Sequence, residues 1–143
     1  MSLDRSWIEE HIPHQGRMCL LDEVLEWDAK CAKCRSSSHR SLDNPLRAYG
    51  RLGASCGVEY AAQTMAVHGA AIAAAAGVHC PPGYLASVRG LQLHVDQLDD
   101  ISADLIASVQ HVAGNERTAL YEFSVTDGQR ILLSGRATIA FIT

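Results

Sequence analysis

The sequence has 143 residues, enough for one domain with a sizeable core, and we expect residues 1–143 to form a single domain. Hydrophobic residues make up 48% and charged residues 20%, and the net charge of −4 provides no basic surface for nucleic acid. No apolar run is long enough to span a bilayer and no secretory signal is recognisable. We therefore expect a cytoplasmic protein without nucleic-acid or membrane partners.

The first predicted elements are a short helix and two strands. The pattern over Ser6–Ile12 predicts a helix with Ser6 as its N-cap and Glu9 completing a capping box. Residues 17–28 carry the apolar Met18, Leu20, Val24 and Leu25, and small residues alternate roughly with polar ones in residues 29–39, which predicts two adjacent strands.

The longest predicted element is an apolar helix. Residues 40–53 are rich in turn formers and predict a loop before it. Residues 54–76 are rich in alanine and contain no proline, which predicts a long helix surrounded by protein. Gly77 suits the C-cap position, and the prolines that follow it end the helix.

The C-terminal part of the chain predicts four strands. Residues 84–98 and 101–112 each alternate in polarity, and residues 118–142 indicate a hairpin around Asp127–Gly128. Because short turns join these strands, we expect an antiparallel meander. The sheet and the long helix must bury each other's apolar faces, so the predicted fold class is α+β, a hot-dog fold with an antiparallel sheet wrapped around a central helix. Its open edge strand favours pairing of two protomers as a dimer.

The five cysteines are an odd number and are expected to be reduced. Cys31 and Cys34 have the spacing of half a zinc site, but the sequence contains no second CxxC and no HxxxH. Residues three apart on a strand point to opposite faces, which is unsuitable for chelation. We therefore predict neither a metal site nor a cofactor.

Three stretches of the sequence resemble the 3-hydroxyacyl-[acyl-carrier-protein] dehydratases. "IPHQGRMCLLDEVLEWD" resembles their N-terminal motif through Pro13, His14 and Asp22. "GVEYAAQ" resembles their helix motif through Glu59, Ala62 and Gln63, and "YLASVRGLQLHV" resembles the strand that follows. The order of the elements is similar over nearly the whole chain.

One departure from that family concerns its usual histidine. The family carries a His-Phe-Pro-Gly segment fourteen residues before the helix glutamate, and Pro45 stands at that position here. The chain therefore resembles the divergent dehydratase-like proteins that lack the loop histidine, found with aryl-polyene, polyketide or fatty-acid clusters. His39 lies nearest to the missing histidine in sequence, but six residues too early.

The resemblance implies a dehydratase that acts on 3-hydroxyacyl thioesters carried by acyl carrier protein. Such a reaction needs two proton carriers, and the matched positions make Glu59 and His14 the candidate catalytic residues. Either residue also has a structural interpretation, because Glu59 could merely complement the helix N-terminus and His14 could bond backbone. His68 is nine residues past Glu59, roughly on the opposite face of the helix, so a structural role is expected for it.

The remaining candidates would contact the substrate. Backbone N–H groups of the first helical turn, including those of Ala54 and Ser55, could bind the thioester oxygen. Gly57 would let the acyl chain approach the backbone, and Gln63 would hold Glu59 or contact substrate. The small side chains of Ala62 and Ala66 would leave room for an apolar tunnel, and arginines of the preceding loop could bind a carrier phosphate: Arg40, Arg47 and Arg51.

Two other functions remain open on the sequence alone. The chain could be an acyl-thioesterase that uses Glu59 to activate water, in which case it would release a free thiol. Alternatively, it could be a non-catalytic subunit that binds an active hot-dog partner, in which case it would show no turnover alone.

Overall fold

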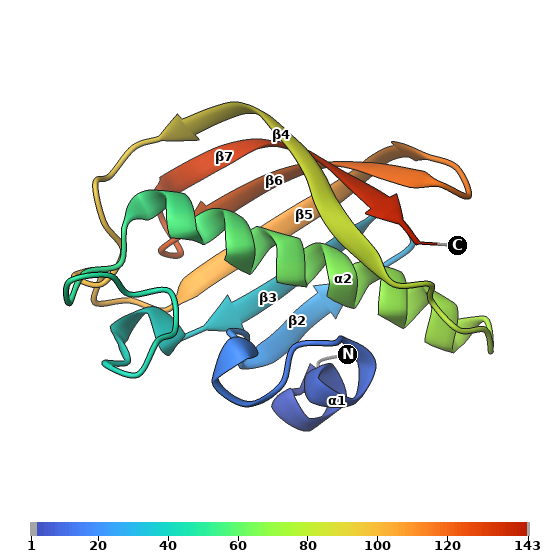
Figure 1. The fold of residues 1–143 in the computed structure, drawn as a ribbon, viewed down its shortest axis with the longest axis horizontal. Coiled ribbons are helices and arrows are strands. Elements are labelled where there is room, and N and C mark those ends of the chain that lie inside the picture. Colours follow the sequence, from blue (N-terminus) through green and yellow to red (C-terminus); the bar gives the residue numbers. More distant parts are fainter. Residues whose placement is uncertain (1–2, 143) are drawn as a thin grey trace.

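The computed structural model describes residues 3–142, so residues 1, 2 and 143 of the predicted domain lie outside the described part. One curved sheet holds a long helix against its concave face (Figure 1). This arrangement confirms the predicted antiparallel sheet wrapped around a central helix. The elements in chain order are β1 (Leu3–Asp4), α1 (Arg5–His11), a 3-10 turn (Gly16–Met18), β2 (Glu23–Trp27), β3 (Cys31–Ser36), a 3-10 turn (Ser38–Arg40), a 3-10 turn (Ala54–Cys56), α2 (Gly57–Ala75), β4 (Gly83–Leu93), β5 (Leu105–Gly114), β6 (Thr118–Thr126) and β7 (Ile131–Phe141).

The seven-stranded sheet has the order β1-β2-β3-β5-β6-β7-β4, and all its neighbours are antiparallel. The predicted hairpin at Asp127–Gly128 is confirmed, since β6 pairs with β7. The predicted four-strand meander is wrong in one respect, because β4 pairs with β7 rather than with β5. The chain between Leu93 and Leu105 therefore crosses from one edge of the sheet to its middle, and β4 is left as an open edge.

The first helix begins earlier than predicted. Asp4, not Ser6, is its N-cap, because the Asp4 carboxylate accepts a 3.0 Å hydrogen bond from the N–H of Trp7. Strand β1 ends at Asp4, which lets the helix start at Arg5. An aspartate is as good a cap as a serine, so the position of the strand end decides which is used.

Helix α2 ends as the sequence predicts. Gly77 adopts a left-handed conformation with φ of 71°, and its N–H donates to the carbonyl of Ala74. The N–H of Val78 donates to the carbonyl of Ala73, which completes a Schellman motif. Tyr60, Ala61 and other buried side chains of α2 face the sheet. The C-terminal end of α2 is exposed to solvent at Ile72, Ala74 and Ala75. Within residues 3–142, no helix is both long and apolar enough to cross a bilayer.

Candidate active site

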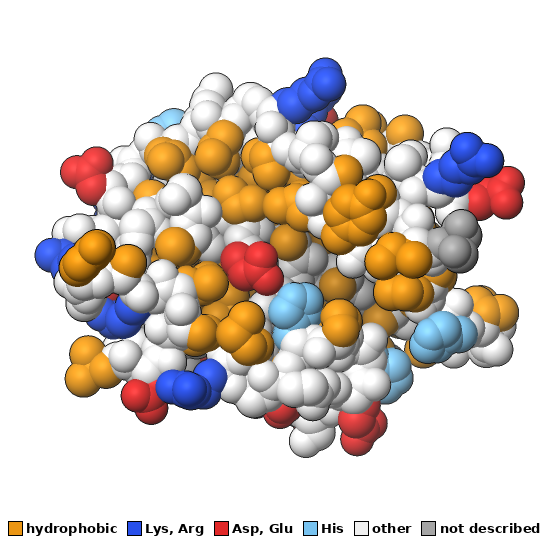
Figure 2. Space-filling view, in the orientation of Figure 1, with side chains coloured by type: hydrophobic (Ala, Val, Ile, Leu, Met, Phe, Trp, Pro, Cys, Tyr) orange, Lys and Arg blue, Asp and Glu red, His pale blue; other side chains and the backbone are white. Residues whose placement is uncertain are grey.

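A cavity of about 620 Å³ opens beside α2. Its walls come from α2, from the segment that follows α1, from residues 79–85 and from the inner faces of β6 and β7. Figure 2 shows the face of the molecule over α2, where hydrophobic side chains surround an acidic side chain and a neighbouring histidine. The cavity is thus mainly apolar, with few polar groups on its wall, as in binding sites for small apolar molecules.

Glu59 and His14 meet on the wall of this cavity. His14 Nε2 lies 3.4 Å from Glu59 Oε1, and the two side chains are 27% and 38% exposed. His14 Nδ1 is buried and has no hydrogen-bond partner among the described residues. Only Nε2 of this ring can therefore exchange a proton with Glu59 or with a molecule in the cavity.

Gln63 connects Glu59 to the segment that carries His14. Its amide nitrogen donates to the carbonyl of Met18 at 2.8 Å and to Glu59 Oε1 at 3.4 Å. Its amide oxygen accepts from the N–H of Leu20 at 2.9 Å, and the whole side chain is buried. The structure thus brings Gln63 to Glu59, as one of its two predicted roles requires, and contact with substrate stays a prediction.

Gln63→Leu is expected to lower the free energy of unfolding by about 2–4 kcal/mol. The substitution keeps the volume but leaves the buried N–H of Leu20 and the partly buried carbonyl of Met18 without their partner, at about 1–3 kcal/mol each. Urea unfolding measures this change. The matched control is Gln110→Leu. Gln110 is an exposed residue of β5, so we expect a change of about 0.5 kcal/mol or less. Equal effects of the two variants would contradict this role for Gln63.

The other predicted substrate contacts divide into two groups. Ala62 and Ala66 line the cavity, and Gly69 and Ala70 continue this stripe of small residues along α2. The residues at the start of the helix do not line it: Ala54, Ser55 and Gly57.

Two of the backbone N–H groups predicted to be free are already bonded. The N–H of Ala54 donates to the carbonyl of Asp96, and that of Cys56 donates to the carbonyl of Gly53. Gly57 serves packing rather than an acyl chain, because a Cβ at residue 57 would lie 2.5 Å from Leu133 Cδ2. The N–H groups of Ala54 and Cys56 are therefore not open donors, contrary to expectation, whereas a role of Ser55 in binding the thioester stays a prediction.

The comparisons with known proteins agree with this fold. The model of the ApeP-like family, described as ApeP dehydratase, matches residues 6–141. The chain belongs to the ApeP-like dehydratase family. A comparison with curated proteins finds no significant match.

Solved structures similar to this ApeP-like chain share its hot-dog fold. A chain of the dehydratase heterocomplex ApeI:P from Xenorhabdus doucetiae is 18% identical with a TM-score of 0.84, covering 95% of this chain and 91% of that one. A hypothetical thioesterase with coenzyme A from Streptococcus pneumoniae TIGR4 is 12% identical with a TM-score of 0.59, covering 83% and 84%. An HP0420 homologue from Helicobacter felis is 8% identical with a TM-score of 0.63, covering 94% and 89%.

Two further histidines of this ApeP-like chain are buried away from the cavity wall. His39 Nε2 donates to the carbonyl of Ile101 at 2.9 Å, and burial lowers the pKa of His39. His68 Nε2 donates to the carbonyl of Asp28, so its Nδ1 accepts from the hydroxyl of Tyr121 at 2.8 Å. Burial is also the main cause that lowers the pKa of His68. Both rings are neutral parts of the core, as expected for His68.

The arginines of the loop before α2 are engaged within the chain. Arg40 pairs with Asp104 at 2.7 Å, and Arg51 pairs with Asp99 at 2.9 Å. Arg47 donates to the carbonyls of Ser41, Gly50 and His39, so it links the two ends of the loop before α2. These contacts count against the predicted role in binding a carrier phosphate. Among residues 3–142 of this ApeP-like chain, no three His, Cys, Asp or Glu side chains are grouped as metal ligands would be.

Sequence reasoning missed the part of the wall that lies opposite α2. Tyr121 from β6 and the aromatic end of β7 at Phe141 line the cavity together with Tyr84 from β4. The alternation in β6 that buries Ala119, Tyr121 and Phe123 was a usable signal for Tyr121. No comparable signal marks Tyr84, because β4 reaches the cavity only through its pairing with β7.

Proposed function

We propose that this ApeP-like chain dehydrates 3-hydroxyacyl thioesters carried by acyl carrier protein, in a fatty-acid, polyketide or aryl-polyene type of biosynthesis. The observation that carries the proposal is the contact of His14 Nε2 with Glu59 Oε1 at 3.4 Å on the wall of an apolar cavity. The elimination of water needs one group that takes a proton and one that gives a proton. A contacting histidine and carboxylate provide one group for each task.

The proposed cycle begins with a protonated Glu59 and with His14 Nε2 free of its proton. His14 Nε2 takes the proton from C2 of the substrate, and the electron pair of that C–H bond forms the C2–C3 double bond. The C3–O bond breaks, and the leaving hydroxyl takes the proton of Glu59 and departs as water. His14 then returns its proton across the short gap to Glu59 Oε1, which restores the starting state. The cycle consumes no cofactor.

The acyl chain would extend along the small residues of α2. A Cβ at residue 69 would lie only 3.3 Å from Cys80 Sγ, so a larger side chain there would fill the cavity. We expect Gly69→Leu to lower kcat/KM for a long acyl chain by roughly 50-fold, because about three methylene groups lose burial at about 0.8 kcal/mol each.

Rates with thioesters of graded chain length measure this effect. The shortest substrate should be turned over at the wild-type rate, because its chain would not reach residue 69. The matched control is Ala74→Leu, at an exposed position of the same helix. An equal loss for short and long chains would contradict the proposed path of the acyl chain.

A second hot-dog subunit is the proposed partner, in a homodimer or a heterodimer. Strand β4 is an open edge of 11 residues, and it exposes the large apolar side chains of Tyr84, Leu91 and Leu93. An edge of this length and character favours pairing with another strand. The heterocomplex described for ApeI:P supports a partner of the same fold for this chain.

The test uses the purified chain, alone and together with a hot-dog subunit that co-purifies with it. A 3-hydroxyacyl thioester of acyl carrier protein is added, and absorbance of the conjugated enoyl thioester is followed together with free thiol. Enoyl product without thiol is the expected result. Thiol release without enoyl product would replace this proposal by the thioesterase, and the absence of both would leave the non-catalytic subunit.

A further inference from the structure

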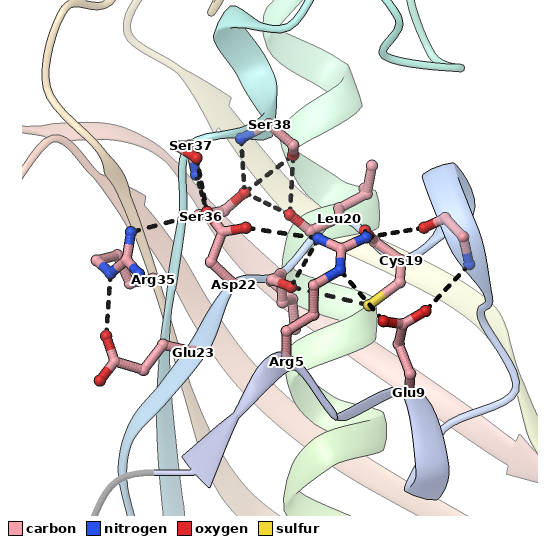
Figure 3. A network of polar contacts seen from close by, with 12 residues as sticks. Arg5, Glu9, Cys19, Leu20, Asp22, Glu23, Arg35, Ser36, Ser37 and Ser38 are labelled. Atoms are coloured by element: carbon pink, nitrogen blue, oxygen red, sulfur yellow. Dashed lines mark hydrogen bonds and ion pairs between the residues drawn. The ribbon is translucent and has the colours of Figure 1, made fainter. Parts of the chain in front are cut away.

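Arg5 binds the irregular segment that leads from His14 into β2. Its guanidinium donates to the carbonyls of Gly16 at 2.8 Å and Cys19 at 2.9 Å, and it lies 3.5 Å from the carbonyl of Leu21 (Figure 3). A guanidinium carries five N–H donors in a fixed plane, so it can hold several carbonyls at once. One side chain of α1 thus fixes the course of the backbone over residues 16–21.

Two carboxylates hold the Arg5 guanidinium in place. Glu9 Oε1 lies 3.3 Å from Arg5 Nε, and Glu9 Oε2 accepts from the N–H of Gly16. Asp22 Oδ1 lies 3.5 Å from Arg5, and its other oxygen accepts from the N–H and the hydroxyl of Ser37 at 2.7 Å each. Arg5 is therefore held by Glu9 of its own helix and, through Asp22, is linked to Ser37 at the end of β3 (Figure 3).

The same segment is held from its other side by α2. Gln63 bonds the carbonyl of Met18 and the N–H of Leu20, and it also contacts Glu59. His14 itself has only one polar contact among the described residues, the one to Glu59. The position of its ring therefore depends on how the backbone on both sides of it is held.

We infer that Arg5 is a positioning residue, whose guanidinium keeps His14 Nε2 within proton-transfer distance of Glu59. The catalytic consequence rests on the proposed function, whereas the geometric consequence does not. A lysine cannot replace Arg5, because one ammonium group cannot reach carbonyls spread over residues 16–21 with a fixed orientation.

The test compares Arg5→Met with Arg130→Met. Arg130 is the control, since its guanidinium also pairs with a carboxylate, that of Asp127 at 3.1 Å in the turn between β6 and β7, and it does not line the cavity. We expect Arg5→Met to lower kcat by about 10- to 100-fold with KM changed by less than about twofold, because the cavity wall keeps its residues. Arg5→Lys should fail to restore kcat, and Arg130→Met should leave both constants unchanged.

A second readout does not depend on turnover. The NMR signal of the His14 ring nitrogen Nε2 is recorded with and without Glu59→Gln. This substitution should shift the signal in the wild-type and Arg130→Met backgrounds and should have no effect in Arg5→Met. If the wild type proves inactive, only the proposed function fails, and the NMR comparison still decides the role of Arg5.

The inference is overturned if Glu59→Gln shifts the His14 signal equally in all three backgrounds. If Arg5→Met does not fold, Glu9→Gln takes its place, because it keeps Arg5 but removes one of the carboxylates that orient it. A partial loss of the His14 response in Glu9→Gln supports the inference, and an unchanged response contradicts it.

Discussion

Glu59→Gln is expected to lower kcat for a 3-hydroxyacyl thioester by about 10³-fold, with little change in stability. The amide cannot deliver a proton to the leaving hydroxyl, and a positioned proton donor typically contributes 10²- to 10⁴-fold. The glutamine keeps the size of the side chain and its reach to Gln63. Since Glu59 is 38% exposed, loss of its contact with His14 should cost about 1 kcal/mol of stability or less.

Enoyl formation and thermal unfolding, measured on the same preparations, check this expectation. The matched control is Glu122→Gln on β6, whose carboxylate is 46% exposed and pairs with Arg136 at 3.1 Å. Glu122 does not line the cavity of Glu59, so this variant should keep the wild-type rate. Equal rates of the wild type and Glu59→Gln would leave Glu59 with only the structural role at the start of α2.

Much of the fold could be predicted because its signals are local. The alanine-rich run and Gly77 define α2 and its end, and the Asp127–Gly128 dipeptide defines the hairpin of β6 and β7. The position of β4 could not be predicted in this way. Its pairing with β7 joins strands that lie far apart in the sequence, which local patterns do not reveal.

The candidate site could be predicted only in part, for the same reason. The motif resemblance identified His14 and Glu59 as candidates. The structure places His14 Nε2 3.4 Å from Glu59 Oε1, and their catalytic roles stay predictions. The N–H of Ala54 was wrongly expected to be open, because its acceptor is the carbonyl of Asp96, which lies beyond β4. Gly57 was assigned to the substrate because the close approach of Leu133 from β7 is invisible in the sequence.

His14→Asn should lower kcat by about 10²- to 10³-fold, because asparagine cannot take a proton from C2. Its stability should change little, since the contact with Glu59 is the only polar contact that the His14 ring makes among the described residues. If the two residues exchange one proton in each cycle, they act as a unit. The double variant His14→Asn/Glu59→Gln should then be about as slow as the slower single variant, rather than slower by the product of both effects.

Single-turnover rates of enoyl formation, measured for the wild type, the two single variants and the double variant, check the expectation. The matched control is His94→Asn, an exposed histidine beyond the end of β4 that does not line the cavity. It should leave the rate and the additivity of the Glu59 effect unchanged. Rates that multiply in the double variant would mean that His14 and Glu59 act in separate steps, and direct return of the proton from Nε2 to Oε1 would then be excluded.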